Sequence, residues 1–156
     1  MCIRDSDNPL SVGAARRRER FASKAEALQN YASKPPLSLL QPEVLVAYVE
    51  HGFETEPDGS VTLRCRPAEE ARVFANGACH HAFRDLAKVG CPVELACGGL
   101  TDSFGDELLR ALSDRLTDGG GTVRTTAFGE LGHLGPMERP EVVAAGMTEA
   151  FSRSAR

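Results

Sequence analysis

Two titratable side chains near the C-terminus carry the clearest chemical signal in this sequence. Asp102 follows the run Cys91–Cys97, and His133 follows the run Thr122–Phe128, each after a glycine turn. A helical stretch, 104–117, lies between the two runs. An aspartate that orients a histidine supplies two parts of a catalytic triad, in which the histidine takes the proton of a nucleophile and returns it to the leaving group. We therefore interpret His133 as a candidate general base and Asp102 as its orienting acid.

The elements around these two residues determine whether they can meet. A strand, a helix and a second strand at this spacing form a βαβ unit, so we predict a parallel pair with a right-handed crossover. The carboxyl ends of parallel strands lie at one edge of a sheet, where open α/β sheets build their sites. The pattern therefore predicts that Asp102 and His133 leave the same edge, within or near hydrogen-bond distance of each other.

Other roles are open for the acidic residues nearby. Asp102 could equally cap the helix that begins near Phe104, because aspartate is a preferred N-cap. Glu130 is a weaker candidate for the acid, since it lies very close to His133 in sequence. Glu138 comes just before the last helix, where we expect it to accept backbone N–H groups rather than to bind substrate.

The remaining pattern is mostly helical. We expect helices over 11–32, 42–51, 67–74, 80–89 and 140–151, and a short strand or extended piece over 61–65. Only two strands of the sheet are clear, although parallel strands are normally buried on both faces inside larger sheets. We therefore expect these strands to be the end of a larger α/β sheet.

Length and charge exclude several classes. The chain has 156 residues, a length typical of one domain, and a formal net charge of -4. This mild acidity gives no reason to expect nucleic acid or an anionic membrane as a partner. No apolar run approaches the ~20 residues needed to span a bilayer, so we expect a cytoplasmic protein.

The five cysteines are scattered and odd in number, which argues against a disulfide framework and favours reduced thiols. A metal site would have to gather Cys65, Cys79, His80, His81 and Cys91. Zinc sites usually show tighter paired spacing of their ligands, so we expect no metal and no other cofactor.

The order and spacing of these motifs resemble the α/β-hydrolase superfamily. Gly99-Leu-Thr-Asp102 resembles the turn that carries the family's catalytic acid after its penultimate strand. Leu131-Gly-His133, followed by Pro136-Met-Glu-Arg-Pro140, resembles the family's histidine loop and final helix. The resemblance implies a helical cap over residues 7–78 and the C-terminal part of the core over 79–156.

The fold class implied is a partial α/β-hydrolase fold, with a cap, a parallel βαβ unit and a C-terminal helix. In this family the nucleophile elbow, Gly-x-Ser-x-Gly, and the oxyanion loop precede the cap. The sequence contains no Gly-x-[Ser/Asp/Cys]-x-Gly, and residues 1–6 resemble a non-native leader. We therefore expect a C-terminal fragment whose nucleophile-bearing half is absent.

The resemblance implies a parent enzyme that hydrolyses an ester, a lactone or a related bond in a small apolar molecule. The nucleophile could be serine, aspartate or cysteine, and the oligomeric state is equally open. We expect the chain to be inactive alone, because a base and an acid without a nucleophile have nothing to activate. An alternative of another class is a non-catalytic binding or interaction module that uses the apolar surface of the cap.

Overall fold

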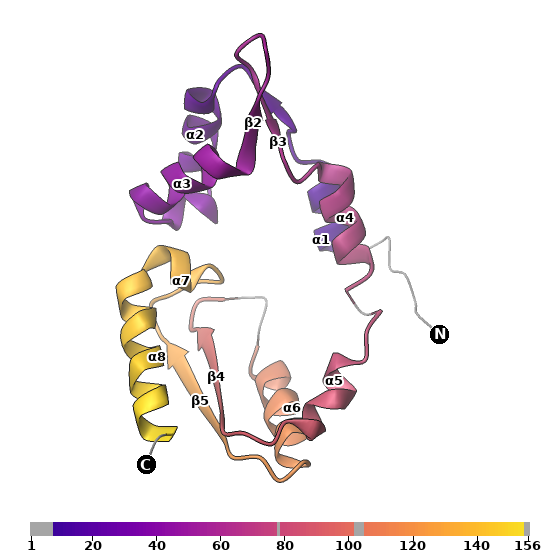
Figure 1. Ribbon diagram of the computed structural model, residues 1–156, viewed down its shortest axis with the longest axis vertical. Helices are drawn as coiled ribbons and strands as arrows, with labels where there is room; N and C mark the ends of the chain where they lie inside the picture. The colour runs from indigo at the N-terminus through magenta and orange to yellow at the C-terminus, as the bar shows by residue number, and fades with distance from the viewer. Residues whose placement is uncertain (1–7, 78, 102–104, 155–156) are drawn as a thin grey trace. The chain divides into compact units, whose positions relative to one another are not determined.

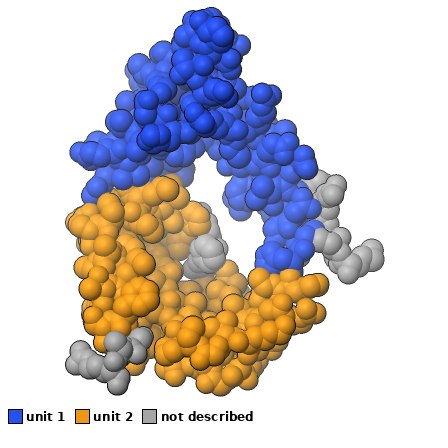
Figure 2. Space-filling model, viewed as in Figure 1, with its two compact units in different colours: residues 1–80 blue, residues 81–156 orange. Residues whose placement is uncertain are grey.

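The structure is a computed structural model that describes residues 8–77, 79–101 and 105–154. The chain divides into two compact units, residues 1–80 and residues 81–156, which Figure 2 colours separately. Within the described ranges, none of the helices combines the length and the apolar character that crossing a membrane requires.

The first unit combines helices with a small antiparallel sheet (Figure 1). Its elements are α1 (Pro9–Ala15), β1 (Arg20–Phe21), α2 (Lys24–Ala32), a 3₁₀ turn (Leu37–Leu39), α3 (Pro42–Gly52), β2 (Phe53–Thr55), β3 (Val61–Leu63) and α4 (Pro67–Ala75). The sheet order is β1-β3-β2, and both pairs are antiparallel. The helices predicted over 42–51 and 67–74 are confirmed as α3 and α4.

The single helix predicted over 11–32 is wrong. Ser23 caps a new helix, α2, by accepting the N–H of Glu26 at 3.2 Å, and the Glu26 carboxylate accepts the N–H of Ala22 at 2.6 Å. This arrangement resembles a capping box, with the carboxylate bonded one residue before the N-cap, and it starts a helix at a defined residue. The residues just before it pair with β3 instead of continuing α1.

Aromatic rings form the core of the first unit. Phe21 packs edge-on against Phe53, with 5.7 Å between ring centroids, and lies 5.8 Å from Tyr31. Phe21 and Phe53 are each 1% exposed. Aromatic pairs in this geometry add to the stabilisation that burial of their surface provides. A partly buried guanidinium, that of Arg17, borders this core and donates a hydrogen bond to the Tyr48 hydroxyl at 2.9 Å.

The second unit contains the βαβ unit. Its elements are α5 (Ala82–Asp85), a 3₁₀ turn (Leu86–Lys88), β4 (Val93–Gly98), α6 (Asp106–Thr117), β5 (Val123–Phe128), α7 (Gly135–Glu138) and α8 (Pro140–Ser154). β4 and β5 are parallel and in direct register, from Val93 opposite Val123 to Gly98 opposite Phe128. The predicted parallel pair and the C-terminal helix are therefore confirmed. The helix predicted over 80–89 is shorter than expected, and α7 was not predicted.

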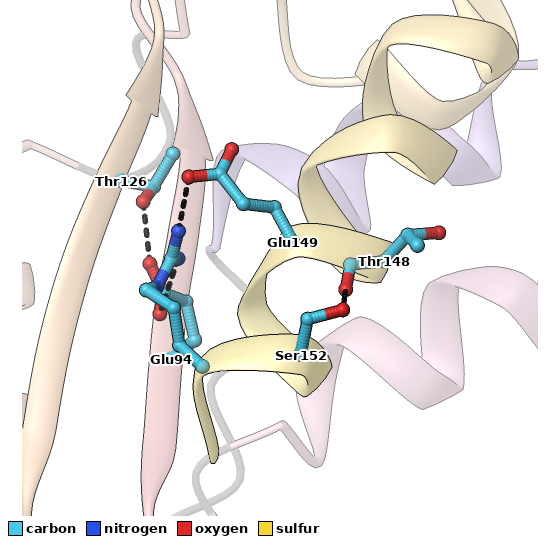
Figure 3. A network of polar contacts seen from close by, with 6 residues as sticks. Glu94, Thr126, Thr148, Glu149 and Ser152 are labelled. Atoms are coloured by element: carbon cyan, nitrogen blue, oxygen red, sulfur yellow. Dashed lines mark hydrogen bonds and ion pairs between the residues drawn. The ribbon is translucent and has the colours of Figure 1, made fainter. Parts of the chain in front are cut away.

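A polar network joins α8 to the sheet (Figure 3). The Glu94 carboxylate on β4 accepts a hydrogen bond from the Thr126 hydroxyl on β5 and forms an ion pair with Arg153 of α8 at 3.1 Å. Arg153 also pairs with Glu149, one turn earlier on the same helix. The Thr126 hydroxyl, followed by the Arg153 guanidinium, lowers the pKa of Glu94 below its ordinary value of 4.5. This network holds a helix on a sheet face and requires no ligand.

The cysteines differ in state. Cys65, Cys91 and Cys97 are free thiols, whereas Cys79 is disulfide-bonded. The expectation of reduced thiols is therefore wrong for Cys79. In the described ranges, no group of three or more histidine, cysteine, aspartate or glutamate side chains is placed to hold a metal ion.

Candidate active site

The candidate site lies at the carboxyl edge of the parallel pair. Beyond β4, the N–H of Gly99 donates to the carbonyl of Phe128 at 2.8 Å, and the N–H of Leu100 donates to the carbonyl of Leu131 at 2.9 Å. The segments that follow the two strands therefore leave the same edge and run alongside each other. This part of the geometric prediction is confirmed.

Two backbones touch at this edge, which explains a glycine there. A Cβ added at Gly98 would run into the carbonyl oxygen of Gly132 and would lie 2.5 Å from that of Leu131. A residue without a Cβ is what such a close approach of two main chains requires. The turn after β4 and the loop after β5 thus hold each other in place through main-chain atoms.

His133 lies on the loop after β5, between a buried anchor and a buried carboxylate. Leu131, two residues earlier, is 5% exposed, and Glu138, five residues later, is 8% exposed. The N–H of Gly132 donates to Glu138 Oε2 at 2.8 Å. Glu138 therefore accepts a backbone N–H, as expected, but the donor belongs to the histidine loop and not to the start of α8.

Asp102 lies outside the described residues, together with 103 and 104. Its distance to His133 and its assignment as the orienting acid stay predictions. Thr101, the residue before it, is described, and its N–H donates to the carbonyl of Gly98 at 3.3 Å. Glu130, the weaker candidate for the acid, is exposed on the histidine loop.

A cavity of about 300 Å³ opens beside His133. Most of its lining is apolar, and its polar contributors include His133, Thr101 and the free thiol of Cys97. The apolar side chains come from β4, α6, β5, the histidine loop, α7 and α8, and include Leu95, Leu109, Leu112, Phe128, Leu131, Pro136 and Val143. A mainly apolar hollow with a few polar groups is typical of small-molecule sites. Sequence reasoning identified His133 but missed this lining, because it depends on how α6 and α8 pack.

No protein-family model and no curated protein matches this chain. Among solved structures, it is similar to an E-2-(acetamidomethylene)succinate hydrolase, with a TM-score of 0.73 and 16% identity, over 92% of this chain and 51% of that one. It is also similar to the peroxisomal α/β-hydrolase Lpx1 from Saccharomyces cerevisiae, with a TM-score of 0.73 and 13% identity, over 91% of this chain and 38% of that one.

A third similar structure is the thioesterase domain from the curacin biosynthetic pathway, with a TM-score of 0.56 and 14% identity, over 84% of this chain and 43% of that one. The chain thus spans about half the length, or less, of the structures it matches. Likeness at such low identity concerns the fold and not the reaction. The parallel βαβ unit, the histidine loop and these matches agree on one architecture: this chain has part of the α/β-hydrolase fold.

Proposed function

We propose that this chain supplies the acid and the base of an α/β-hydrolase triad, and that the complete enzyme hydrolyses an ester, a lactone or a related bond in a small apolar molecule. One observation carries the proposal. His133 stands on a loop clamped at the carboxyl edge of the parallel strands and lines a mainly apolar cavity of about 300 Å³. A histidine in that place can face both a nucleophile and a bound acyl group.

The chemistry assigned to His133 is general base and then general acid. It would take the proton of a nucleophile, and it would return that proton to the leaving alcohol or other leaving group. Asp102 would hold the imidazole in the correct tautomer. If the nucleophile is instead an aspartate, His133 would activate the water that hydrolyses the covalent intermediate. Serine, aspartate and cysteine nucleophiles all stay within the proposal.

Under this proposal we expect the polypeptide to be inactive by itself. Its sequence has no nucleophile elbow, and in the family the oxyanion donors also precede the cap. Neither covalent catalysis nor stabilisation of a tetrahedral intermediate is then available. The proposed partner is a small-molecule substrate, and neither nucleic acid nor a membrane is part of the proposal.

The test compares the chain alone with a fusion that joins it to the upstream half of a related hydrolase. With p-nitrophenyl esters, we expect the chain alone to stay at background and the fusion to gain activity. In the fusion, His133→Ala should lower kcat on the order of 10⁴-fold, since triad members act as a unit. Asp102→Asn should cost somewhat less, by leaving the imidazole in the wrong tautomer.

Two controls make the test specific. His51→Ala removes an exposed histidine of α3 in the first unit and should leave the activity of the fusion unchanged. Cys97→Ala removes the free thiol that lines the cavity, and activity should survive this change as well. Full activity of the His133→Ala fusion would refute the assigned base. Robust turnover by the unfused chain, abolished by Cys97→Ala, would reveal a nucleophile within this chain.

A second candidate is a non-catalytic interaction module. Large apolar side chains on the first unit are more than half exposed, among them Leu10 at 59%, Leu39 at 55% and Val73 at 69%. Scattered exposed apolar residues are common on soluble proteins, so this observation supports the interaction module less strongly than the histidine loop supports the hydrolase. A fusion that folds with an intact nucleophile elbow and still shows no hydrolysis would favour the module.

A further inference from the structure

Glu138 is a buried carboxylate at the candidate site that is bonded to the main chain and not to a basic side chain. It is 8% exposed, and among the described residues it forms no ion pair. Its hydrogen bond is to the main chain: Oε2 accepts the N–H of Gly132 at 2.8 Å. Burying an ionised carboxylate costs free energy unless hydrogen bonds compensate it. A buried carboxylate on the segment that follows the proposed base, bonded to the residue before that base, therefore calls for a specific role.

The contact between Glu138 and the loop is tight. A Cβ at position 132 would lie 2.8 Å from Glu138 Oε1, so an alanine there would have to displace the carboxylate from its present position. Gly132 does not have a positive φ, so the glycine serves this approach and not an unusual backbone conformation. The carboxylate therefore holds the peptide group between Leu131 and Gly132, one peptide before the bond that joins Gly132 to His133.

The opposite side of the loop is held as well. The carbonyl of Leu131 accepts the N–H of Leu100 from the turn after β4, and the side chain of Leu131 is buried. The carbonyl of Leu131 is therefore bonded to the turn after β4, and the N–H of Gly132 is bonded to Glu138. His133 is exposed and directly follows this held peptide group, so the main chain through which Glu138 acts leads straight to it.

We propose that Glu138 is a positioning residue, which acts through the Gly132 N–H to hold His133 where it can reach the reacting atoms. This inference rests on the proposed function of His133. A displacement of about 1 Å in a catalytic group can cost on the order of 10²-fold in rate. Glu138 has no direct contact with substrate in this role, so its loss should lower kcat and leave KM nearly unchanged.

The first experiment uses the active fusion and three variants. Glu138→Ala removes the acceptor, and we expect kcat to fall on the order of 10²-fold with KM changed less than about 3-fold. Glu138→Gln keeps an oxygen that can accept the same N–H, so we expect it to restore kcat to within about 3-fold of the parent. The matched control is Glu141→Ala, which removes an exposed carboxylate three positions away and should leave kcat unchanged.

A second variant approaches the same contact from the other partner. Gly132→Ala places a Cβ against the Glu138 carboxylate, and we expect a similar fall in kcat. If the two residues act through one contact, Gly132→Ala combined with Glu138→Ala should cost little more than either change alone. Additive losses would mean that the two residues act separately, and this would overturn the proposed mechanism.

Hydrogen–deuterium exchange of the unfused 156-residue chain provides a readout that needs no activity. We expect Glu138→Ala to speed exchange in the peptide spanning 129–134 by about 10-fold or more, and Glu138→Gln to change it much less. Unchanged exchange in Glu138→Ala would refute the proposed effect of Glu138 on the loop, whether or not the proposed function is correct. Full kcat in Glu138→Ala, while His133→Ala is inactive, would refute the positioning role and leave the proposed function intact.

Discussion

The two units of this chain are similar in length but bury their side chains very differently. The first unit encloses Phe21, Phe53 and Val61 at 1% exposure each. In the described part of the second unit, Leu116 and Leu131 are the buried apolar side chains, while Phe151 is 72% and Met147 is 54% exposed. The unit with the closed core therefore contains none of the predicted catalytic residues. The unit with the candidate site relies on main-chain contacts and a few polar bonds.

The difference follows from the type of sheet in each unit. The antiparallel sheet of the first unit needs cover on one face only, where the Tyr31 ring of α2 packs against the strand residues Phe21 and Phe53. The parallel pair of the second unit has two strands among the described residues. Parallel strands are normally found inside larger sheets. The candidate site is therefore built on the unit whose sheet depends more on further strands for its stability.

The largest expected effect tests the core of the first unit. Phe53→Ala should cost about 3–5 kcal/mol in free energy of unfolding, because it leaves a cavity among packed rings. The matched change in the second unit, Phe151→Ala, should stay within about 0.5 kcal/mol, because that ring is exposed. Denaturant unfolding followed by far-ultraviolet circular dichroism reports on both units, and tyrosine fluorescence reports on the first unit alone, since both tyrosines of the chain lie there and the chain has no tryptophan. Equal losses for the two variants would contradict the comparison.

The next effect concerns the chain in its native state. Amides of α2 and α3 should exchange about 10²-fold more slowly, or slower still, than those of β4 and β5, since local stability follows buried contacts. The second unit should also bind a hydrophobic dye, and the chain should tend to form oligomers because of its exposed apolar side chains and open strand edge. Site-resolved hydrogen exchange at low protein concentration measures the first effect. A well-behaved monomer with uniform protection and no dye binding would overturn this prediction.

A smaller effect is expected at the polar border of the first core. Arg17 pairs with Glu70 of α4 and donates to Tyr48 of α3, with a quarter of each ion-pair side chain still exposed. Glu70→Ala should cost about 1–2 kcal/mol, because it leaves a partly buried guanidinium with fewer acceptors. Glu69→Ala is the matched control on the same helix, since its pair with Arg72 is well exposed, and it should cost less than about 0.5 kcal/mol. The same tyrosine signal measures both, and indistinguishable variants would show that the ion pair contributes nothing.

The smallest effect is a pH dependence confined to the second unit. The Thr126 hydroxyl and the Arg153 guanidinium lower the pKa of Glu94 in the folded chain. The carboxylate therefore stabilises the fold above its ordinary pKa of 4.5, and this contribution is lost as the pH falls through the lowered value. Glu94→Gln should remove this part of the acid sensitivity. Unfolding by urea between about pH 3 and 6, followed by far-ultraviolet circular dichroism, compares the two proteins, and identical pH profiles would exclude a role for Glu94.

The parts of the fold that could be predicted are those with long, regular patterns. The runs before Asp102 and His133 and the helix between them gave the βαβ unit, because a right-handed crossover leaves little choice of topology. The division between α1 and α2 was missed, although the Ser23 to Glu26 capping box was readable in the sequence. The two-residue strand β1 could not be predicted, since two residues carry no periodicity and its pairing is decided by β3.

Sequence reasoning singles out His133 as a candidate residue of the site but does not identify what holds its loop. His133 could be identified because a glycine turn and a proline-flanked segment surround it. The hydrogen bond between Glu138 and Gly132 could not be predicted, because α7 has only four residues and the bond depends on how the loop before it turns back. The cavity lining was out of reach for the same reason, since it collects side chains from α6 and α8 that are far apart in sequence.

The direct register of β4 and β5 has a consequence for how the chain folds. Every residue of β4 pairs with a residue 30 positions later, whereas Thr55 of β2 pairs with Val61 of β3 across a short turn. Closing the longer loop costs roughly 1 kcal/mol more in chain entropy, and non-local pairing slows folding. The hairpin of the first unit should form early and locally, while the parallel pair waits for α6. During synthesis the first unit also leaves the ribosome before the second, so the elements that carry the candidate site are assembled after those of the first unit.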